Sequence, residues 1–171
     1  MIRVLDKVID IILGIIFTAA IILMLLLVGV RLFGLAPYVV TSGSMEPVYP
    51  VGSIVYAKDV PSEQLAVGDD ITFYLDQDVV ATHRIGEIYP EEGEVQTYGV
   101  NNIDSEGNHI NDARTVDFDQ IIGKVKYSIP MVGFVYLFLR TTYGKIAVLI
   151  IVLALFTSSQ AIKYLKKERK K

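Results

Sequence analysis

The sequence predicts a mainly β fold, in which an antiparallel β domain is flanked by N- and C-terminal transmembrane helices. Two long uncharged apolar runs lie near the ends of the 171-residue chain, and short β-branched runs alternate with turn residues between them. Hydrophobic residues make up 52% of the chain and its formal net charge is only −3, which excludes a disordered or collagen-like protein. Cysteine is absent, so disulfide scaffolds and thiolate metal sites are excluded as well.

The first apolar run, residues 11–30, contains twenty consecutive residues without a charge. As a helix rising about 1.5 Å per residue, it covers roughly the 30 Å hydrocarbon core of a bilayer. A cleaved secretory signal is the competing interpretation, but the apolar region of such a signal spans only about 7–15 residues. We therefore expect a transmembrane helix at 11–30, preceded by an N-terminal segment at 1–10.

The second apolar run, residues 146–162, has seventeen uncharged residues between Lys145 and Lys163. Flanking lysine side chains can extend to the membrane surface and allow a short helix to span, while a helix lying on that surface is the alternative. Residues 163–171 hold six basic residues and one acidic residue. The positive-inside rule then predicts that this tail and residues 1–10 are cytoplasmic, in a two-span cell-membrane protein with residues 36–140 outside.

Residues 36–140 are expected to form one β-rich domain. The predicted strands lie at 38–41, 53–56, 70–74, 79–83, 95–98 and 121–127, and each is bounded by turn residues. Residues 76–78 predict a hairpin turn, and the polar segment 99–111 predicts an irregular loop. Residues 32–139 contain five basic and sixteen acidic side chains, a charge that disfavours nucleic acid as a partner.

Ser44 and His83 are the residues best suited to nucleophilic chemistry. Ser44 lies among small residues just after a predicted strand, where a hydroxyl can be held toward a cleft, although a plain turn is the alternative. His83 ends a predicted strand on the same face as its apolar residues. An imidazole with a pKa of about 6.5 can take the proton of a serine, although a hydrogen-bonded structural histidine is the alternative.

Five motifs in this order resemble those of the type I signal peptidase family, in the branch found in archaea, the endoplasmic reticulum and some spore-forming bacteria. Each motif alone is a weak signal, but five in the right order are a strong one. They cover about residues 36–140 and lie at 42–47, 67–73, 82–85, 99–102 and 122–130.

The resemblance implies a membrane-bound serine endopeptidase that cleaves N-terminal signal peptides from exported precursor proteins after small-x-small motifs. Ser44 matches the nucleophile, and His83 stands where the commoner bacterial branch has a lysine base. The Ser44 N–H matches the oxyanion-stabilising position, with help from the Ser42 hydroxyl, and Met45 is expected beside the bound substrate. No cofactor or metal is implied. The implied partners are signal-peptide-bearing precursors, membrane lipid and the secretion translocon.

An apolar rim at the lipid surface is also expected. The residues assigned to this rim are Leu35, Ala36, Tyr38, Met45 and the segment 131–134.

The acid that orients His83 is assigned to Asp104, with Asp112 as the alternative. Asp104 follows Asn101 and Asn102 at nearly the spacing of the family's second acid. The chain departs from the family pattern at two positions of this segment, with Tyr98 in place of lysine and Val100 in place of aspartate. An altered specificity or a loss of activity would be consistent with those departures.

Two other functions are compatible with the same sequence. A non-catalytic membrane-anchored β domain could serve as a receptor or assembly factor, and it would not depend on Ser44. A membrane-tethered peptidase with a dedicated clientele, such as spore, biofilm or pilus precursors, would use the same catalytic residues as a general signal peptidase.

Overall fold

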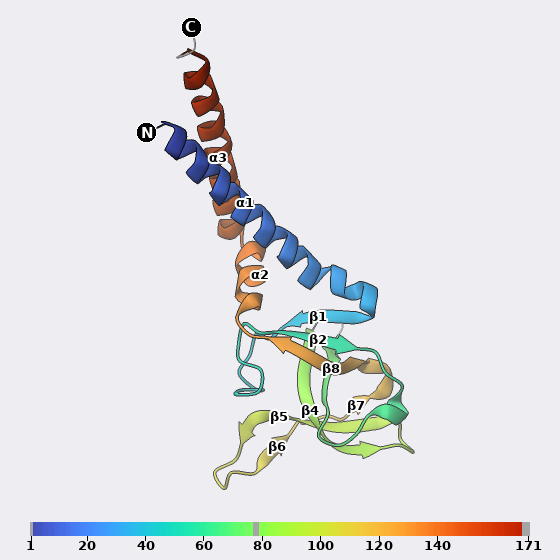
Figure 1. Cartoon of the computed structure of the whole chain (residues 1–171). Coiled ribbons are helices and arrows are strands. Elements are labelled where there is room, and N and C mark those ends of the chain that lie inside the picture. Colours follow the sequence, from blue (N-terminus) through green and yellow to red (C-terminus); the bar gives the residue numbers. More distant parts are fainter. Residues whose placement is uncertain (1, 77–78, 169–171) are drawn as a thin grey trace. The chain divides into compact units, whose positions relative to one another are not determined.

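The computed structural model describes residues 2–76 and 79–168 of the chain. The chain divides into two compact units (Figure 1). One unit consists of the described residues up to Val28 and from Tyr136 onward, and the other, called the β unit here, is Gly29–Val135. The β unit thus begins and ends several residues before the domain expected at 36–140.

The β unit contains a single antiparallel sheet in the order β1-β2-β8-β3-β4-β5-β6, with β7 paired to β5 (Figure 1). This architecture confirms the prediction of a mainly antiparallel β fold. Short 3₁₀ segments lie at Gly29–Phe33, Ser62–Gln64 and Phe118–Gln120. The strands are β1 (Leu35–Val39), β2 (Ile54–Lys58), β3 (Asp70–Asp76), β4 (Val79–Tyr89), β5 (Glu94–Ile103), β6 (His109–Asn111), β7 (Val116–Asp117) and β8 (Ile121–Ile129).

The prediction of an irregular loop at 99–111 is wrong, because β5 continues through Ile103 and β6 returns beside it as a hairpin. The tip of this hairpin is closed by Asp104, whose carboxylate accepts hydrogen bonds from the backbone N–H groups of Glu106 and Asn108. The segment therefore combines strand pairing with a local polar turn. Of the hairpin turn predicted at 76–78, residues 77 and 78 lie outside the described residues.

The core of the β unit lies on one face of the curved sheet. Alternation along β3 places Ile71 and Phe73 in this core, and both side chains are almost fully buried. The intervening Thr72 is buried as well, and its hydroxyl shares a 2.9 Å hydrogen bond with that of Thr82 on β4. The core residues are Leu65, Ile71, Phe73, Ile85, Val95 and Val116.

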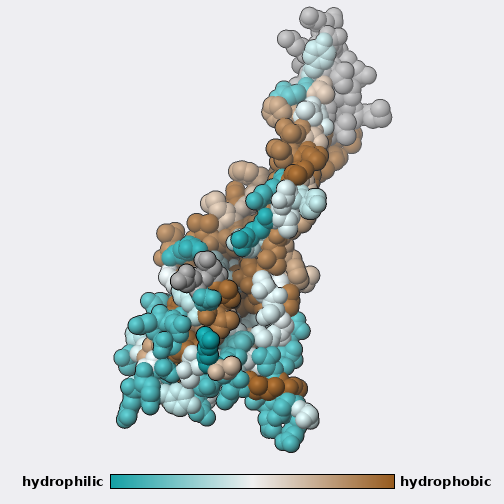
Figure 2. Space-filling view, turned by 180° about the vertical axis from the view of Figure 1, so that it is seen from behind, coloured by the Kyte–Doolittle hydropathy of each residue, from teal (hydrophilic) through white to brown (hydrophobic). Residues whose placement is uncertain are grey.

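Three helices complete the chain, namely α1 (Ile2–Leu27), α2 (Val132–Arg140) and α3 (Thr142–Glu168). Figure 2 shows mostly apolar residues over the long helices and mostly polar residues over the strands of the β unit. Within the described residues, the helical stretch Lys7–Phe33 is by itself long and apolar enough to cross a membrane. The segments Val132–Arg140 and Thr142–Ser158 meet the same criterion only together, and they are bent by 93°. The N-terminal apolar helix is therefore present, and a C-terminal span stays a prediction.

The core predicts a strong contrast between two neighbouring aromatic residues of β3. Phe73→Ala removes a ring that is 1% exposed, and the lost burial together with the resulting cavity should lower the free energy of unfolding by about 3–5 kcal/mol. Tyr74→Ala is the matched control, because Tyr74 is exposed on the opposite face of the same strand. Thermal unfolding of the full chain in detergent measures both variants. Equal destabilisation by the two substitutions would contradict the assignment of the core face.

Candidate active site

Ser44 lies on the segment between β1 and β2, residues 40–53, which we call the serine loop. Backbone hydrogen bonds close this loop at its base, where the Val40 N–H donates to Ser53 and the Gly52 N–H donates to Val40. The Met45 side chain next to the serine is 1% exposed and anchors the loop to the interior. Ser44 is therefore held on a loop that is fixed both at its base and at its middle.

The serine loop is docked directly on β5. The Asn101 N–H donates to the Ser44 carbonyl at 2.7 Å, and the Asn101 side-chain amide donates to the Gly43 carbonyl at 3.0 Å. Gly99 lies so close that a Cβ at this position would be 2.8 Å from the Ser44 carbonyl oxygen and 2.9 Å from the Ser44 Cβ. Only glycine lets strand and loop approach this closely.

His83 lies in the middle of β4 and faces the serine loop. Its Nε2 is 3.0 Å from the Ser44 Oγ, which is hydrogen-bond distance. The imidazole packs edge-on against Phe73, with ring centroids 6.2 Å apart, and its side chain is 14% exposed. The structure thus brings together the two residues that the sequence identified as nucleophile and base.

Asp112, just after β6, supplies the carboxylate that contacts the other imidazole nitrogen. Its Oδ2 is 2.6 Å from the His83 Nδ1 and also accepts a 2.6 Å hydrogen bond from the hydroxyl of the buried Thr97. The Asp112 N–H donates to the Thr97 carbonyl, which continues the strand pairing beyond β6. Ser44, His83 and Asp112 therefore form one continuous chain of hydrogen bonds.

The assignment of Asp104 beside His83 is corrected by this geometry. The Asp104 carboxylate lies at the exposed hairpin tip and is occupied by the Asn108 backbone and side chain and the Glu106 N–H. The backbone and side-chain hydrogen bonds from Asn108, with those of nearby N–H groups, lower the pKa of Asp104. Spacing along the chain favoured Asp104. In the structure Asp104 lies in the turn of the β5–β6 hairpin, and Asp112 lies beside Thr97 where the chain comes back along β5.

A second polar cluster, centred on Asp70, joins the serine loop to the strand of His83. Arg84 donates two hydrogen bonds to the Asp70 carboxylate, at 2.7 and 3.0 Å, and the Tyr49 hydroxyl donates a third at 2.9 Å. Burial and the Asp70 carboxylate raise the pKa of Tyr49, so this hydroxyl stays a donor at neutral pH. Sequence reasoning missed this cluster, although Arg84 adjoins His83 in one of the motifs.

The remaining predicted site residues have distinct positions. The Ser42 hydroxyl lies 3.3 Å from the Ser44 hydroxyl. Met45 is buried, so its assignment to a lipid-facing rim is wrong, whereas Met131 and Phe134 of the same predicted rim are exposed. Among residues 2–76 and 79–168, no group of three or more histidine or acidic side chains could hold a metal ion.

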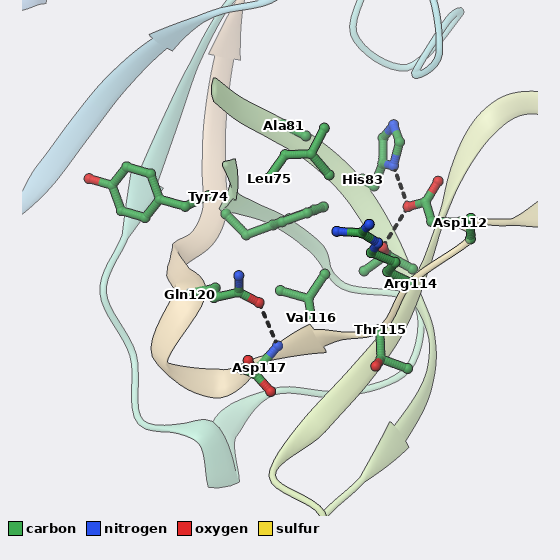
Figure 3. A pocket seen from close by; sticks show the side chains of 13 residues that line it. Tyr74, Leu75, Ala81, His83, Asp112, Arg114, Thr115, Val116, Asp117 and Gln120 are labelled. Atoms are coloured by element: carbon green, nitrogen blue, oxygen red, sulfur yellow. Dashed lines mark hydrogen bonds and ion pairs between the residues drawn. The ribbon is translucent and has the colours of Figure 1, made fainter. Parts of the chain in front are cut away.

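Two cavities meet at His83. The first, of about 450 Å³, is lined by Ser42, Ser44 and residues 38–41 and 79–83. The second, of about 540 Å³, is shown in Figure 3 and contains His83 and Asp112, with Arg114 extending over it. His83 therefore lies between a cavity that holds the serine and a cavity on the side of the carboxylate.

A serine, an imidazole and a carboxylate in this order define the arrangement of a serine hydrolase. Signal peptidase I W of Bacillus subtilis (strain 168) is 40% identical to the chain over 82 residues, which is 43% of each protein. The signal peptidase complex catalytic subunit sec11 of Dictyostelium discoideum is 31% identical over 126 residues, which is 71% of this chain and 70% of that protein. No family model matches the chain.

These comparisons confirm the resemblance. The chain belongs to the type I signal peptidase family. Its similarity to the two signal peptidases named above implies that it is a serine protease. The alignment with the Bacillus protein spans less than half of that protein's length.

The contact between β5 and the serine loop predicts a strong effect of one added methyl group. Gly99→Ala should push the loop away from β5 and lower the rate at which Ser44 reacts with a fluorophosphonate probe. A loss of about 10²-fold is expected, because a displacement of about 1 Å has that effect on positioned reacting groups. Val100→Ala is the neighbouring control, since it shortens a half-exposed side chain. An unchanged labelling rate in Gly99→Ala would contradict the importance of this contact.

Proposed function

We propose that this protein is a membrane-bound serine endopeptidase that removes N-terminal signal peptides from exported precursor proteins. The observation that carries the proposal is the hydrogen-bonded chain from Ser44 through His83 to Asp112. Membership in a family whose named relatives are signal peptidases supports signal peptides as the substrate class. A non-catalytic receptor domain would have no need of this alignment.

In the proposed reaction, the Ser44 Oγ attacks the carbonyl carbon of the scissile peptide bond while the His83 Nε2 takes its proton. Asp112 holds the Nδ1–H of His83, which fixes the tautomer and stabilises the imidazolium that forms. His83 then gives the proton to the departing amine, and an acyl-enzyme on Ser44 remains. Water activated by His83 hydrolyses this ester and regenerates the hydroxyl.

The Ser44 backbone N–H and the Ser42 hydroxyl are proposed to stabilise the oxyanion. Within the described part of the chain, the Ser44 N–H has no hydrogen-bond partner. The Ser42 hydroxyl lies 3.3 Å from the attacking oxygen and can turn toward the substrate carbonyl. Loss of one such donor costs about 10²–10³ in turnover in other serine proteases.

The signal peptide is proposed to bind as an added strand in the 450 Å³ cavity. In the described residues, β1 pairs with β2 alone, and β4 pairs with β5 only from Arg84 onward. Residues 38–41 and 79–83 line the cavity, and within the described part of the chain each segment is paired along one edge only. An extended peptide can join the unpaired edge of either segment by main-chain hydrogen bonds. The largely apolar lining, which includes Val39 and Ala81, is proposed to accept small side chains at the first and third positions before the cut.

The membrane is proposed to hold the catalytic unit at its outer surface through two spans. The apolar helical stretch Lys7–Phe33 supports the first span, and the uncharged run 146–162 supports the second. The basic residues at 163–171 support a cytoplasmic C-terminus. Precursor proteins, membrane lipid and the secretion translocon are the partners that follow from this location.

The proposed roles predict graded losses of turnover. Ser44→Ala should abolish cleavage, and His83→Ala should lower it by several orders of magnitude because the hydroxyl loses its base. Asp112→Asn should lower turnover by about 10⁴-fold, as the loss of an orienting aspartate does elsewhere. Cleavage of a synthetic precursor by the purified full chain gives all three values.

Asp104→Asn is the matched control, because it makes the same chemical change at the hairpin tip. Its turnover should stay close to that of the unmodified protein. A large loss in Asp104→Asn together with a silent Asp112→Asn would reverse the assignment of the orienting acid. Full activity of Ser44→Ala would remove the serine from the mechanism.

A precursor with alanine at the first and third positions before the cut should be cleaved by the detergent-solubilised protein. Sequencing the new N-terminus should place the cut directly after the small-x-small motif. Bulky side chains at both positions should prevent cleavage, if the proposed strand places these side chains against Val39 and Ala81 in the lining of the cavity. Efficient cleavage of that bulky substrate would contradict the binding mode.

The proposed orientation predicts which parts of the chain an external protease reaches on intact cells. An epitope inserted beside Glu92, between β4 and β5, should be digested, while an epitope placed after residue 171 should survive. The opposite pattern would invert the topology.

A further inference from the structure

The 540 Å³ cavity on the carboxylate side of His83 has no role in the mechanism above. It contains His83 and Asp112 but neither Ser42 nor Ser44, and it shares Leu75 and Ala81 with the cavity that holds the serine. The two cavities are therefore neighbours that meet at the imidazole. An extended chain bound in the 450 Å³ cavity can continue past His83 into this second cavity.

The chemistry of the reaction specifies which part of a substrate reaches the second cavity. In the proposed mechanism, His83 gives its proton to the amine that leaves, so the residues after the scissile bond depart along the imidazole. The signal peptide side occupies the cavity with Ser44. We infer that the second cavity binds the first residues of the mature protein and that Arg114 selects an acidic side chain among them, an inference that rests on the proposed function.

Arg114 is the charged group in this cavity that is free to meet a substrate. It is exposed, and the described residues give it no ion pair or hydrogen bond. The basic side chains of Arg84 on β4 and Lys124 on β8 are occupied, since Arg84 is bonded to Asp70 and Lys124 to Asp69. Figure 3 shows the Arg114 side chain extending over the cavity from the same segment as Asp112. A guanidinium in this position can bind a carboxylate through two parallel hydrogen bonds.

The acidic residues of the same cavity do not cancel this preference. The Asp112 Oδ2 is already hydrogen-bonded to the His83 Nδ1 and to the Thr97 hydroxyl, both at 2.6 Å. Asp117 lies at the end of the cavity away from His83 in Figure 3, beside Gln120, whose side-chain oxygen accepts the Asp117 N–H. A residue soon after the cut therefore meets Arg114 before it meets Asp117. The sixteen acidic residues between 32 and 139 make this unpaired cation a local exception to the charge of the domain.

The test uses one synthetic precursor with a constant small-x-small site and a single glutamate, glutamine or lysine at each of the first four positions after the cut. For the unmodified full chain in detergent, kcat/KM should be about two- to fivefold higher with glutamate than with glutamine at one of these positions, which is the size of an exposed ion pair. Lysine at that position should lower kcat/KM. The preference should weaken as salt is added.

Arg114→Gln should bring the ratio of kcat/KM for glutamate to that for glutamine close to one, and Arg114→Glu should invert it. Lys126→Glu is the control, because it makes a comparable change of net charge on the exposed end of β8, outside the cavity. It should keep the ratio of the unmodified protein.

Three outcomes would overturn the inference. If both Arg114 variants cleave but keep the original ratio, Arg114 does not contact the mature segment. If Lys126→Glu changes the ratio as much as Arg114→Glu does, the preference comes from the overall field of the domain. If the unmodified protein cleaves none of the substrates, the proposed function fails and this inference fails with it.

Discussion

The close contact between the serine loop and β5 is the constraint on which the candidate site depends. Ser44 and His83 come from segments that do not pair with each other, so a third element has to set the distance between them. Asn101 binds the loop through its backbone and its side chain, and Gly99 provides the space for the loop to lie against the strand. Since β5 also pairs with β4 from Arg84 onward, one strand positions both partners of the 3.0 Å hydrogen bond.

Asp70 reinforces this arrangement from the other side. Its carboxylate accepts hydrogen bonds from Tyr49 in the serine loop and from Arg84, the neighbour of His83. A charge-assisted bidentate contact is stronger and more directional than a single neutral hydrogen bond. Removing Arg84 would leave the partly buried Asp70 carboxylate without its ion-pair partner, which is costly. The loop and the strand are thus connected through two separate sets of hydrogen bonds, one through β5 and one through Asp70.

The carboxylate of Asp112 differs from most acidic side chains of the β unit in its surroundings. Most acidic residues lie on the surface, whereas the Asp112 carboxylate is turned inward and satisfied by Thr97 and His83. Residues 38–41 and 79–83, which line the same cavity as Ser44, are mostly apolar.

Much of the fold followed from local patterns in the sequence. Alternation of apolar residues placed the strands around residues 70–74 and 79–83, because strand periodicity is a local property that burial of one face enforces. The long uncharged run at 11–30 predicted α1 because the length and the apolar character of one segment are also local properties. Ser44 and His83, which the structure brings within 3.0 Å, were also named from the sequence, because their neighbours carry motifs that can be recognised without a structure.

Only the tertiary structure shows which aspartate contacts His83. Asp104 and Asp112 are both aspartates in a polar segment, and spacing favoured the nearer one. The hairpin of β5 and β6 carries Asp104 outward into its own turn and brings Asp112 back to Thr97. The Asp70 cluster and the cavity beside Arg114 could not be predicted from the sequence either. Each depends on groups far apart in the chain that meet only because strand pairing and sheet curvature, which no local pattern encodes, bring them to one place.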